Sequence, residues 1–223
     1  MADRVAVDKD KSVLLLVDIQ PDFMPGGPLP TGQGDAIIEP VRDLLQSNCF
    51  RHCAATQDWH PPGHVSFASS HPGRNSFDTI ELYGHEQTLW PDHCVQDTPG
   101  AELHPALPWR NIAVLIRKGM DNAVDSYSGF RNNWNVSGQR PPTGLAGYFR
   151  ERDIDRIFIC GLARDVCVKW TAEDAIELGF RVWFLWDLTR PVDSSTDAKV
   201  REDLQRRGIR IISSDQLICG SMA

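Results

Sequence analysis

Three side chains suited to nucleophilic catalysis stand at the ends of apolar segments. Asp18 follows the run VLLLV, Lys118 closes VLIRK, and Cys167 begins a helical pattern shortly after the apolar run that ends at Gly161. A carboxylate after a buried run needs a partner, because burying an unpaired charge is costly. A thiol in the first turn of a helix lies at the positive end of the helix dipole, and a nearby lysine would favour the thiolate further. The pattern suggests a cysteine nucleophile beside a carboxylate and a lysine.

Each of these residues also has a purely structural interpretation. Asp18 could cap a turn, Lys118 could simply be solvated, and Cys167 could be a buried cysteine, since free cysteine is among the most buried residue types. Cys160, inside an apolar run, fits that last description. Cys167 differs because it stands at the start of a helical pattern.

A second group of residues has the chemistry of metal ligands. Asp58 and His60 form an Asp-x-His pattern in TQDWHPPGHVSFASSH, and His93 follows in LWPDHCVQDTPG. A carboxylate and two imidazoles suit zinc or another divalent transition metal and leave coordination positions open for water or substrate. His64 adds an imidazole in the same stretch. The remaining histidines are interpreted as surface or core residues: His52, His71, His85 and His104.

Aromatic side chains accompany these polar groups. Phe23, Trp90 and Tyr127 stand in the same connecting stretches. They could be ordinary core residues, but beside a metal they would also form a slot for a flat ring.

The elements that must position these residues alternate along the chain. Apolar runs without period-2 alternation predict buried strands at 12–18, 51–57, 112–118, 156–161, 181–187 and 209–213. Helical patterns lie at 36–48, 145–153, 165–179 and 195–208. This order predicts an α/β fold with a doubly wound, mostly parallel six-stranded sheet and helices on both faces. The stretches 58–110 and 119–143 fit no element and follow strand ends, where ligands bind in such sheets.

Size and charge narrow the classes of protein. The 223 residues are enough for one domain, 1–223, and the formal net charge of -7 disfavours nucleic-acid binding and membrane-surface binding. No secretory signal or membrane-spanning run is recognisable. The six cysteines are irregularly spaced, so we expect them to be reduced and the protein to be cytoplasmic.

Together these segments resemble the nicotinamidase/pyrazinamidase enzymes of the isochorismatase-like cysteine hydrolases. The resemblance covers nearly the whole chain, in order, through LLLVDIQPDFMPGG, ATQDWHPPGHVSFAS, LWPDHCVQDTPGAELHP, KGMDNAVDSYSGF and ICGLARDVCVKWTAEDA. It implies the isochorismatase-like hydrolase fold and a set of site residues. These are catalytic Asp18, Lys118 and Cys167; metal ligands Asp58, His60 and His93; and substrate-binding Phe23, Trp90, Tyr127 and Leu162.

The resemblance also implies an activity. It predicts hydrolysis of nicotinamide to nicotinate and ammonia through a thioester on Cys167, in NAD salvage, with pyrazinamide as a further expected substrate. The backbone N–H groups of Ala163 and Cys167 would form the oxyanion hole, after a cis peptide bond between Leu162 and Ala163. One divalent metal is expected, zinc ahead of Fe²⁺ or Mn²⁺.

Several details stay open at this stage. The metal could bind the pyridine nitrogen or activate the hydrolytic water, and His64 or Ser66 could add a contact to it. Arg164 stands where the family commonly has a small polar residue, which could alter the edge of the pocket. Members of the family occur as monomers and as homo-oligomers.

Three rival functions remain. An N-carbamoyl or ureido amidohydrolase would keep the fold and the catalytic group, but a pyridine ring better explains the metal ligands. An isochorismatase proper needs no nucleophilic cysteine. A non-catalytic metal-binding scaffold would make Asp18, Lys118 and Cys167 incidental, and thiol reactivity would separate that case from an enzyme.

Overall fold

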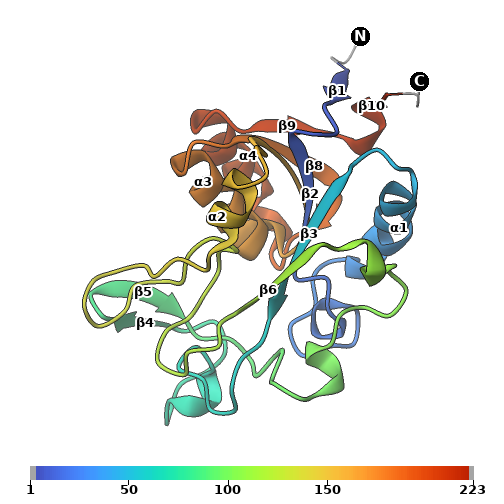
Figure 1. Ribbon diagram of the computed structural model, residues 1–223. Coiled ribbons are helices and arrows are strands. Elements are labelled where there is room, and N and C mark those ends of the chain that lie inside the picture. Colours follow the sequence, from blue (N-terminus) through green and yellow to red (C-terminus); the bar gives the residue numbers. More distant parts are fainter. Residues whose placement is uncertain (1–3, 221–223) are drawn as a thin grey trace.

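The computed structural model describes residues 4–220 and contains a six-stranded sheet in which every neighbouring pair is parallel (Figure 1). The strand order is β6-β3-β2-β7-β8-β9. These strands are β2 (Ser12–Val17), β3 (His52–Asp58), β6 (Val114–Lys118), β7 (Arg156–Leu162), β8 (Arg181–Arg190) and β9 (Arg210–Ile212). The α-helices are α1 (Ile38–Gln46), α2 (Leu145–Arg150), α3 (Lys169–Glu177) and α4 (Asp197–Arg206). The predicted α/β fold is confirmed.

Helices cover both faces of this sheet, with α1 on one side and α2, α3 and α4 on the other (Figure 1). Alternate side chains of β2 enter two separate apolar cores. Leu14 and Leu16 pack in the core that contains α1, whereas Val13 and Leu15 pack in the core that contains the other helices. A strand apolar on both sides is what a sheet covered on both faces requires.

The chain order reverses across the sheet between β2 and β7. From β2 the strands continue to β3 and β6 on one side and to β7, β8 and β9 on the other. In open α/β sheets, ligands bind in the crevice beyond the carboxyl ends of the strands at such a switch point. The ends of β2 and β7 are therefore where a site is expected.

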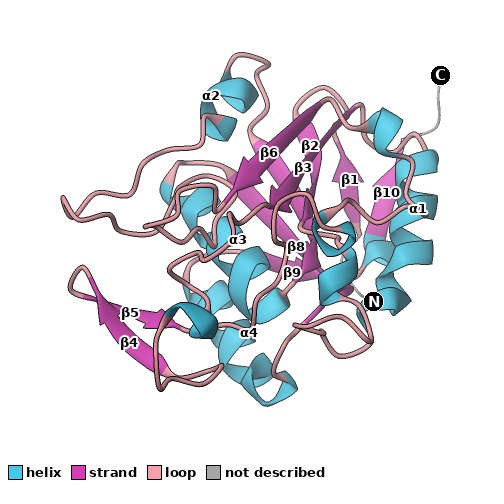
Figure 2. Cartoon of the chain, turned by 90° about the horizontal axis from the view of Figure 1, so that it is seen from below, coloured by secondary structure: helices cyan, strands magenta, loops and turns pink. Residues whose placement is uncertain are grey.

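A β-hairpin projects from the region that the sequence predicted to be loop (Figure 2). Its antiparallel strands are β4 (Thr79–Leu82) and β5 (His85–Thr88). Tyr83 and Gly84 connect them with φ angles of 52° and 82°. Two-residue hairpin turns need positive φ at these positions and favour Asn-Gly or Asp-Gly, so a tyrosine hides the signal. The rest of 58–110 and 119–143 lacks long regular elements.

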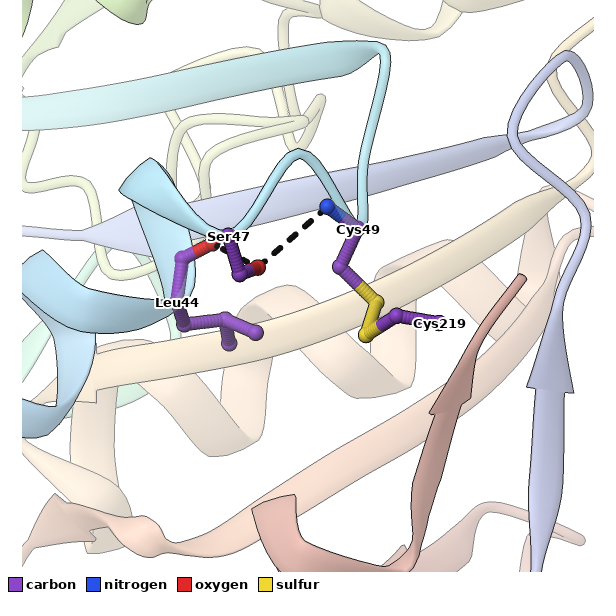
Figure 3. Close-up of a disulfide and its surroundings, with 4 residues drawn as sticks. All are labelled: Leu44, Ser47, Cys49 and Cys219. Atoms are coloured by element: carbon purple, nitrogen blue, oxygen red, sulfur yellow. Dashed lines mark hydrogen bonds between the residues drawn. A yellow bond between two sulfur atoms is a disulfide. The ribbon is translucent and has the colours of Figure 1, made fainter. Parts of the chain in front are cut away.

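The ends of the described chain are joined by a short parallel ribbon and a disulfide. β1 (Val5–Val7) pairs with β10 (Leu217–Cys219), and Cys219 is bonded to Cys49, which lies just past α1 (Figure 3). The expectation that all six cysteines are reduced is therefore wrong for this pair, and the other four are free. The partners lie 170 residues apart in sequence, and only the fold brings them together. The cysteines accordingly no longer argue for a reducing compartment.

Breaking this disulfide should lower stability. Replacing Cys219 with serine releases a loop of 170 residues in the unfolded chain, and we expect the free energy of unfolding to fall by about 2–4 kcal/mol. Denaturant titration of the parent and the variant, with and without reductant, measures this. Cys49→Ser should give the same fall, and neither of these two variants should respond to reductant. Cys53→Ser, at a free cysteine, keeps the disulfide and should lose stability on reduction as the parent does. Equal unfolding midpoints for oxidised and reduced parent protein would contradict the prediction.

None of the helices within residues 4–220 combines the length and apolar character that a membrane crossing requires.

Candidate active site

The strand ends bring the predicted catalytic residues together at one edge of the sheet. Asp18 follows β2, Lys118 ends β6, and Cys167 lies in the turn after β7. The register of β3 and β6 sets Asp58 directly beside Lys118. One ligand atom each of Asp18, Asp58 and Cys167 lies within 4.8 Å of the others. Residues separated by up to 149 positions thus share one site.

Lys118 is the central charge of this site. Its Nζ lies 2.9 Å from Asp18 Oδ2 and donates to Asp58 Oδ1 at 2.9 Å. It also donates to the carbonyl of Ser126 at 2.9 Å and lies 3.5 Å from Cys167 Sγ. Burial alone would lower the pKa of Lys118, but the two carboxylates outweigh it and raise that pKa well above its usual value. The ammonium stays charged and links the cysteine to the metal-ligand group.

Asp18 is held with one carboxylate oxygen available. Thr56 Oγ1 donates to Oδ1 at 2.6 Å. Oδ2 lies beside Lys118, but it receives no well-aligned hydrogen bond from the described residues. Burial raises the pKa of Asp18, an effect that the Lys118 ammonium opposes and the Asp58 carboxylate reinforces. A buried carboxylate with a raised pKa, and with one oxygen that receives no well-aligned hydrogen bond, suits a general base.

Cys167 lies in a single π-helical turn, Arg164–Val168, that leads into α3. Its side chain is buried, and burial raises the thiol pKa well above its usual value, only partly opposed by Lys118. Lys118 does favour the thiolate, as expected, but burial outweighs it. Because desolvation dominates, the resting group is a thiol, and attack requires a base.

The predicted metal ligands also converge. Asp58 Oδ2 lies 3.1 Å from His60 Nε2 and 3.5 Å from His93 Nε2. The other ring nitrogens contact backbone carbonyls, His60 Nδ1 with Gly119 at 3.1 Å and His93 Nδ1 with Pro91 at 2.7 Å. These carbonyls fix the rings with both Nε2 atoms facing the carboxylate, the arrangement that orients imidazole ligands around a metal. The donor set fits a divalent transition metal.

A glycine permits this orientation of His60. Gly119 has a φ of 66°, and a Cβ atom there would lie 2.4 Å from His60 Cε1. Any larger residue would collide with the ring. Gly119, directly after β6, therefore leaves the space that the predicted metal ligand His60 needs.

His64 and Ser66 are engaged with each other. Ser66 Oγ lies 2.7 Å from His64 Nδ1, and His64 Nε2 lies 3.0 Å from the carbonyl of Asp121. Burial lowers the pKa of His64 to about 4, so the ring is neutral. A nitrogen of His64 comes within 4.8 Å of groups on His60 and Asp125, yet both its nitrogens are already occupied. This geometry favours a supporting role over metal ligation.

A cavity connects the two groups, with Cys167 among its lining residues and with Asp58, His60 and His93 also lining it. Its walls include Phe23, Trp90 and Tyr127, and the Cys167 end also exposes Ala163. Leu162 does not line it; that side chain packs in the apolar core instead. The peptide bond between Leu162 and Ala163 is cis, as the resemblance implied. The cavity has aromatic walls, the predicted metal ligands at one end and a thiol at the other. This arrangement suits a flat heteroaromatic ring that carries a carbonyl group.

Sequence reasoning missed part of this cavity. Asp125, Leu29, Val166 and Val192 also line it. Gln87 of the β4–β5 hairpin donates to Asp125 Oδ2 at 2.7 Å and to the Tyr127 hydroxyl at 2.8 Å, so the hairpin supports the wall. A signal existed for Asp125, a carboxylate two positions before Tyr127 in DSYSGF. Leu29 and Val192 are ordinary apolar residues of loops and carry no such signal.

The fold and this site agree with a family match. The family model of the isochorismatase domain matches residues 12–216. The chain therefore belongs to the isochorismatase family. Within that family, the curated relatives that it matches are nicotinamidases. The nicotinamidase of Acinetobacter baylyi is 42% identical over 206 residues, covering 92% of this chain and 94% of the relative. The nicotinamidase of Escherichia coli is 44% identical over 182 residues, covering 81% and 83%.

Similar solved structures are also nicotinamidases and pyrazinamidases. The nicotinamidase/pyrazinamidase of Acinetobacter baumanii is 40% identical with a TM-score of 0.87, covering 93% of this chain and 98% of that one. PnC1 from L. infantum in complex with nicotinate is 37% identical, with a TM-score of 0.83 and coverage of 96% and 98%. The pyrazinamidase of Pyrococcus horikoshii in complex with zinc is 35% identical, with a TM-score of 0.73 and coverage of 91% and 99%.

Proposed function

We propose that this protein is a nicotinamidase, which hydrolyses nicotinamide to nicotinate and ammonia in NAD salvage. One observation carries the proposal. The Lys118 ammonium contacts Asp18 and Cys167 on one side and Asp58 of the metal-ligand group on the other, and Cys167 and Asp58 both line the aromatic-walled cavity. The nicotinamidase relatives and the nicotinate complex of a related structure support it.

The reaction proceeds in two stages. Asp18 accepts the thiol proton as Cys167 Sγ bonds to the carboxamide carbon, and the carbonyl oxygen takes up negative charge. The backbone N–H groups of Ala163 and Cys167 stabilise this oxyanion, a contribution of about 3 kcal/mol for each donor. The C–N bond then breaks, and Asp18 returns its proton to the departing nitrogen, which leaves as ammonia. Water, deprotonated by Asp18, attacks the thioester, and nicotinate leaves with the thiol restored.

Asp58, His60 and His93 would hold the metal. When bound, a divalent ion would supply a Lewis acid at this end of the cavity. We infer zinc ahead of Fe²⁺ or Mn²⁺, because the donor set suits it and a related pyrazinamidase has been solved with zinc. Phe23, Trp90 and Tyr127 flank the ring. Pyrazinamide differs from nicotinamide only in a second ring nitrogen, so the same cavity should accept it.

Ammonia release from nicotinamide tests the proposed function. Purified, metal-replete protein should release ammonia and nicotinate in equal amounts, and N-carbamoyl or ureido compounds at the same concentration should give little. Release from those compounds but none from nicotinamide would replace the proposed substrate while retaining the cysteine chemistry.

Removing a metal ligand should lower metal content. In His60→Ala, one of the Nε2 ligands disappears, and we expect the stoichiometry of bound metal after dialysis to fall to under half of the parent value. Turnover of nicotinamide should fall with it. His64→Ala is the matched control, since both ring nitrogens of His64 are engaged elsewhere, and it should retain most of the metal. Elemental analysis measures the bound metal in both variants. A His60→Ala protein with a full complement of metal would refute the ligand assignment.

The remaining predictions concern the whole protein. We propose that the chain acts as one domain, 1–223, supported by one continuous central sheet and a family match over 12–216. A cytoplasmic location stays a prediction. The choice between monomer and homo-oligomer stays open.

A further inference from the structure

Arg164 is a buried cation beside the nucleophile turn, yet it does not line the cavity. It is 5% exposed and is the first residue of the turn that contains Cys167. Its guanidinium extends to β8 and α4. Nε donates to Thr189 Oγ1 at 2.9 Å, Nη1 contacts both oxygens of Asp197 at 2.8 and 2.7 Å, and Nη2 donates to the carbonyl of Thr189 at 2.6 Å. The expected effect on the pocket edge is therefore indirect.

These contacts fix the guanidinium on several sides at once. Its Cζ atom lies 4.0 Å from the centroid of the Trp186 ring, and Nη2 also approaches the Trp186 carbonyl at 3.3 Å. A planar fork with this many partners has little freedom to shift. A lysine at this position could reach only part of the set. The backbone at Arg164 is accordingly anchored to two neighbouring elements.

The next residue anchors the same turn to a wall of the cavity. Asp165 accepts hydrogen bonds from the backbone N–H groups of Val192 and Asp193, both at 2.9 Å. Val192 lines the cavity together with Ala163 and Cys167. The side chains of the first two residues of the turn therefore join it to β8, to α4 and to the segment between them.

We propose that Arg164 is a positioning residue for oxyanion stabilisation. By anchoring the turn to Thr189 and Asp197, it keeps the N–H groups of Ala163 and Cys167 directed at one point. This inference rests on the proposed thioester mechanism. Because one oxyanion donor contributes about 10²–10³-fold to turnover, partial misalignment of two donors should cost roughly 10- to 100-fold in kcat. Ground-state binding of the ring, which depends on the aromatic walls and the metal, should be unaffected.

The test compares Arg164→Met with a matched ion-pair variant, Lys169→Met. Lys169 lies one residue past the turn, and its Nζ donates to Asp203 of α4 at 2.9 Å, so it also joins this region to α4. Neither Lys169 nor Asp203 lines the cavity. The readouts are kcat and KM for nicotinamide, the melting temperature, and the affinities for nicotinate and for nicotinaldehyde, the inhibitor bound in a yeast nicotinamidase structure. Nicotinaldehyde reports on the tetrahedral state, because the thiol adds to its carbonyl carbon and the oxygen enters the oxyanion hole.

For Arg164→Met we expect kcat and the affinity for nicotinaldehyde to fall together by 10- to 100-fold, with KM and the affinity for nicotinate within about twofold of the parent. Lys169→Met should lower the melting temperature without changing any of these constants. If Arg164→Met does not fold, Asp197→Asn removes the charge of the partner at constant volume and should give a smaller loss of the same kind. A lower melting temperature with unchanged kcat in whichever variant folds would overturn the inference. Absence of nicotinamide turnover in the parent would instead contradict the proposed function, and nicotinaldehyde binding would still test Arg164.

Discussion

Replacing Cys167 with alanine is expected to abolish ammonia release from nicotinamide while leaving the fold and the metal in place. The thioester cannot form without Sγ, and no other free cysteine lines the cavity among residues 4–220. We therefore expect turnover to fall by at least about 10⁴-fold, since removal of a nucleophile eliminates the covalent route entirely. The substitution removes one buried sulfur, so the free energy of unfolding should change by only about 1 kcal/mol.

The control for this variant is Cys160→Ala. Cys160 is equally buried, lies in β7 and packs in the apolar core. Burial raises the pKa of its thiol strongly, so it is inert at neutral pH. Its replacement should lower stability by a similar amount and leave kcat unchanged. The measurements are ammonia release, melting temperature and metal content for both variants. A Cys167→Ala protein that kept more than a hundredth of the parent activity would exclude the thioester mechanism.

The strand ends explain why the site could be predicted from the sequence. Asp18, Asp58 and Lys118 each stand at or just past the end of a strand that the apolar pattern identifies. Parallel strands place their carboxyl ends along one edge, so these side chains must gather there whatever the details of the loops. Cys167 follows the same logic, because β7 pairs with β2 and its connection starts at the switch point.

The parts that could not be predicted depend on contacts between distant segments. The Cys49–Cys219 disulfide exists because the end of α1 meets the end of the chain, and nothing in the cysteine spacing indicates this. Gln87 supports Asp125 and Tyr127 only because an inconspicuous Tyr-Gly turn forms a hairpin. The protonation of Cys167 depends on burial on all sides, which the local sequence does not reveal.

Lys118 links the catalytic residues to the metal-ligand group by ion pairs. Its one ammonium contacts carboxylates from both groups, Asp18 and Asp58. Asp58 also faces His60 and His93, and its pKa lies well below the usual value because His60 and Lys118 outweigh the effect of burial. Asp58 is thus held as an anion, whereas the pKa of Asp18 is raised. Of the two carboxylates near the thiol, Asp18 is the one suited to take its proton.

This assignment makes Asp18→Asn the second decisive variant. Asparagine keeps the volume and can still accept the hydrogen bond from Thr56 Oγ1, but it cannot take a proton from Cys167. General-base catalysis contributes about 10²–10⁴-fold, so we expect kcat to fall by that factor. Alkylation of Cys167 by iodoacetamide should also slow, because the loss of the base outweighs the lower thiol pKa that follows from removing the Asp18 charge.

Asp174→Asn separates this effect from the general cost of changing a buried carboxylate. Asp174 is 2% exposed in α3, forms two hydrogen bonds with Arg140 at 2.7 and 2.9 Å, and does not line the cavity. Its replacement should lower the melting temperature while kcat and the rate of alkylation stay at parent values. If Asp18→Asn kept kcat within tenfold of the parent, Asp18 would not be the base that deprotonates the thiol. The contact between Lys118 and Cys167 would then have to lower the thiol pKa far more than burial raises it, so that the thiolate forms without a base.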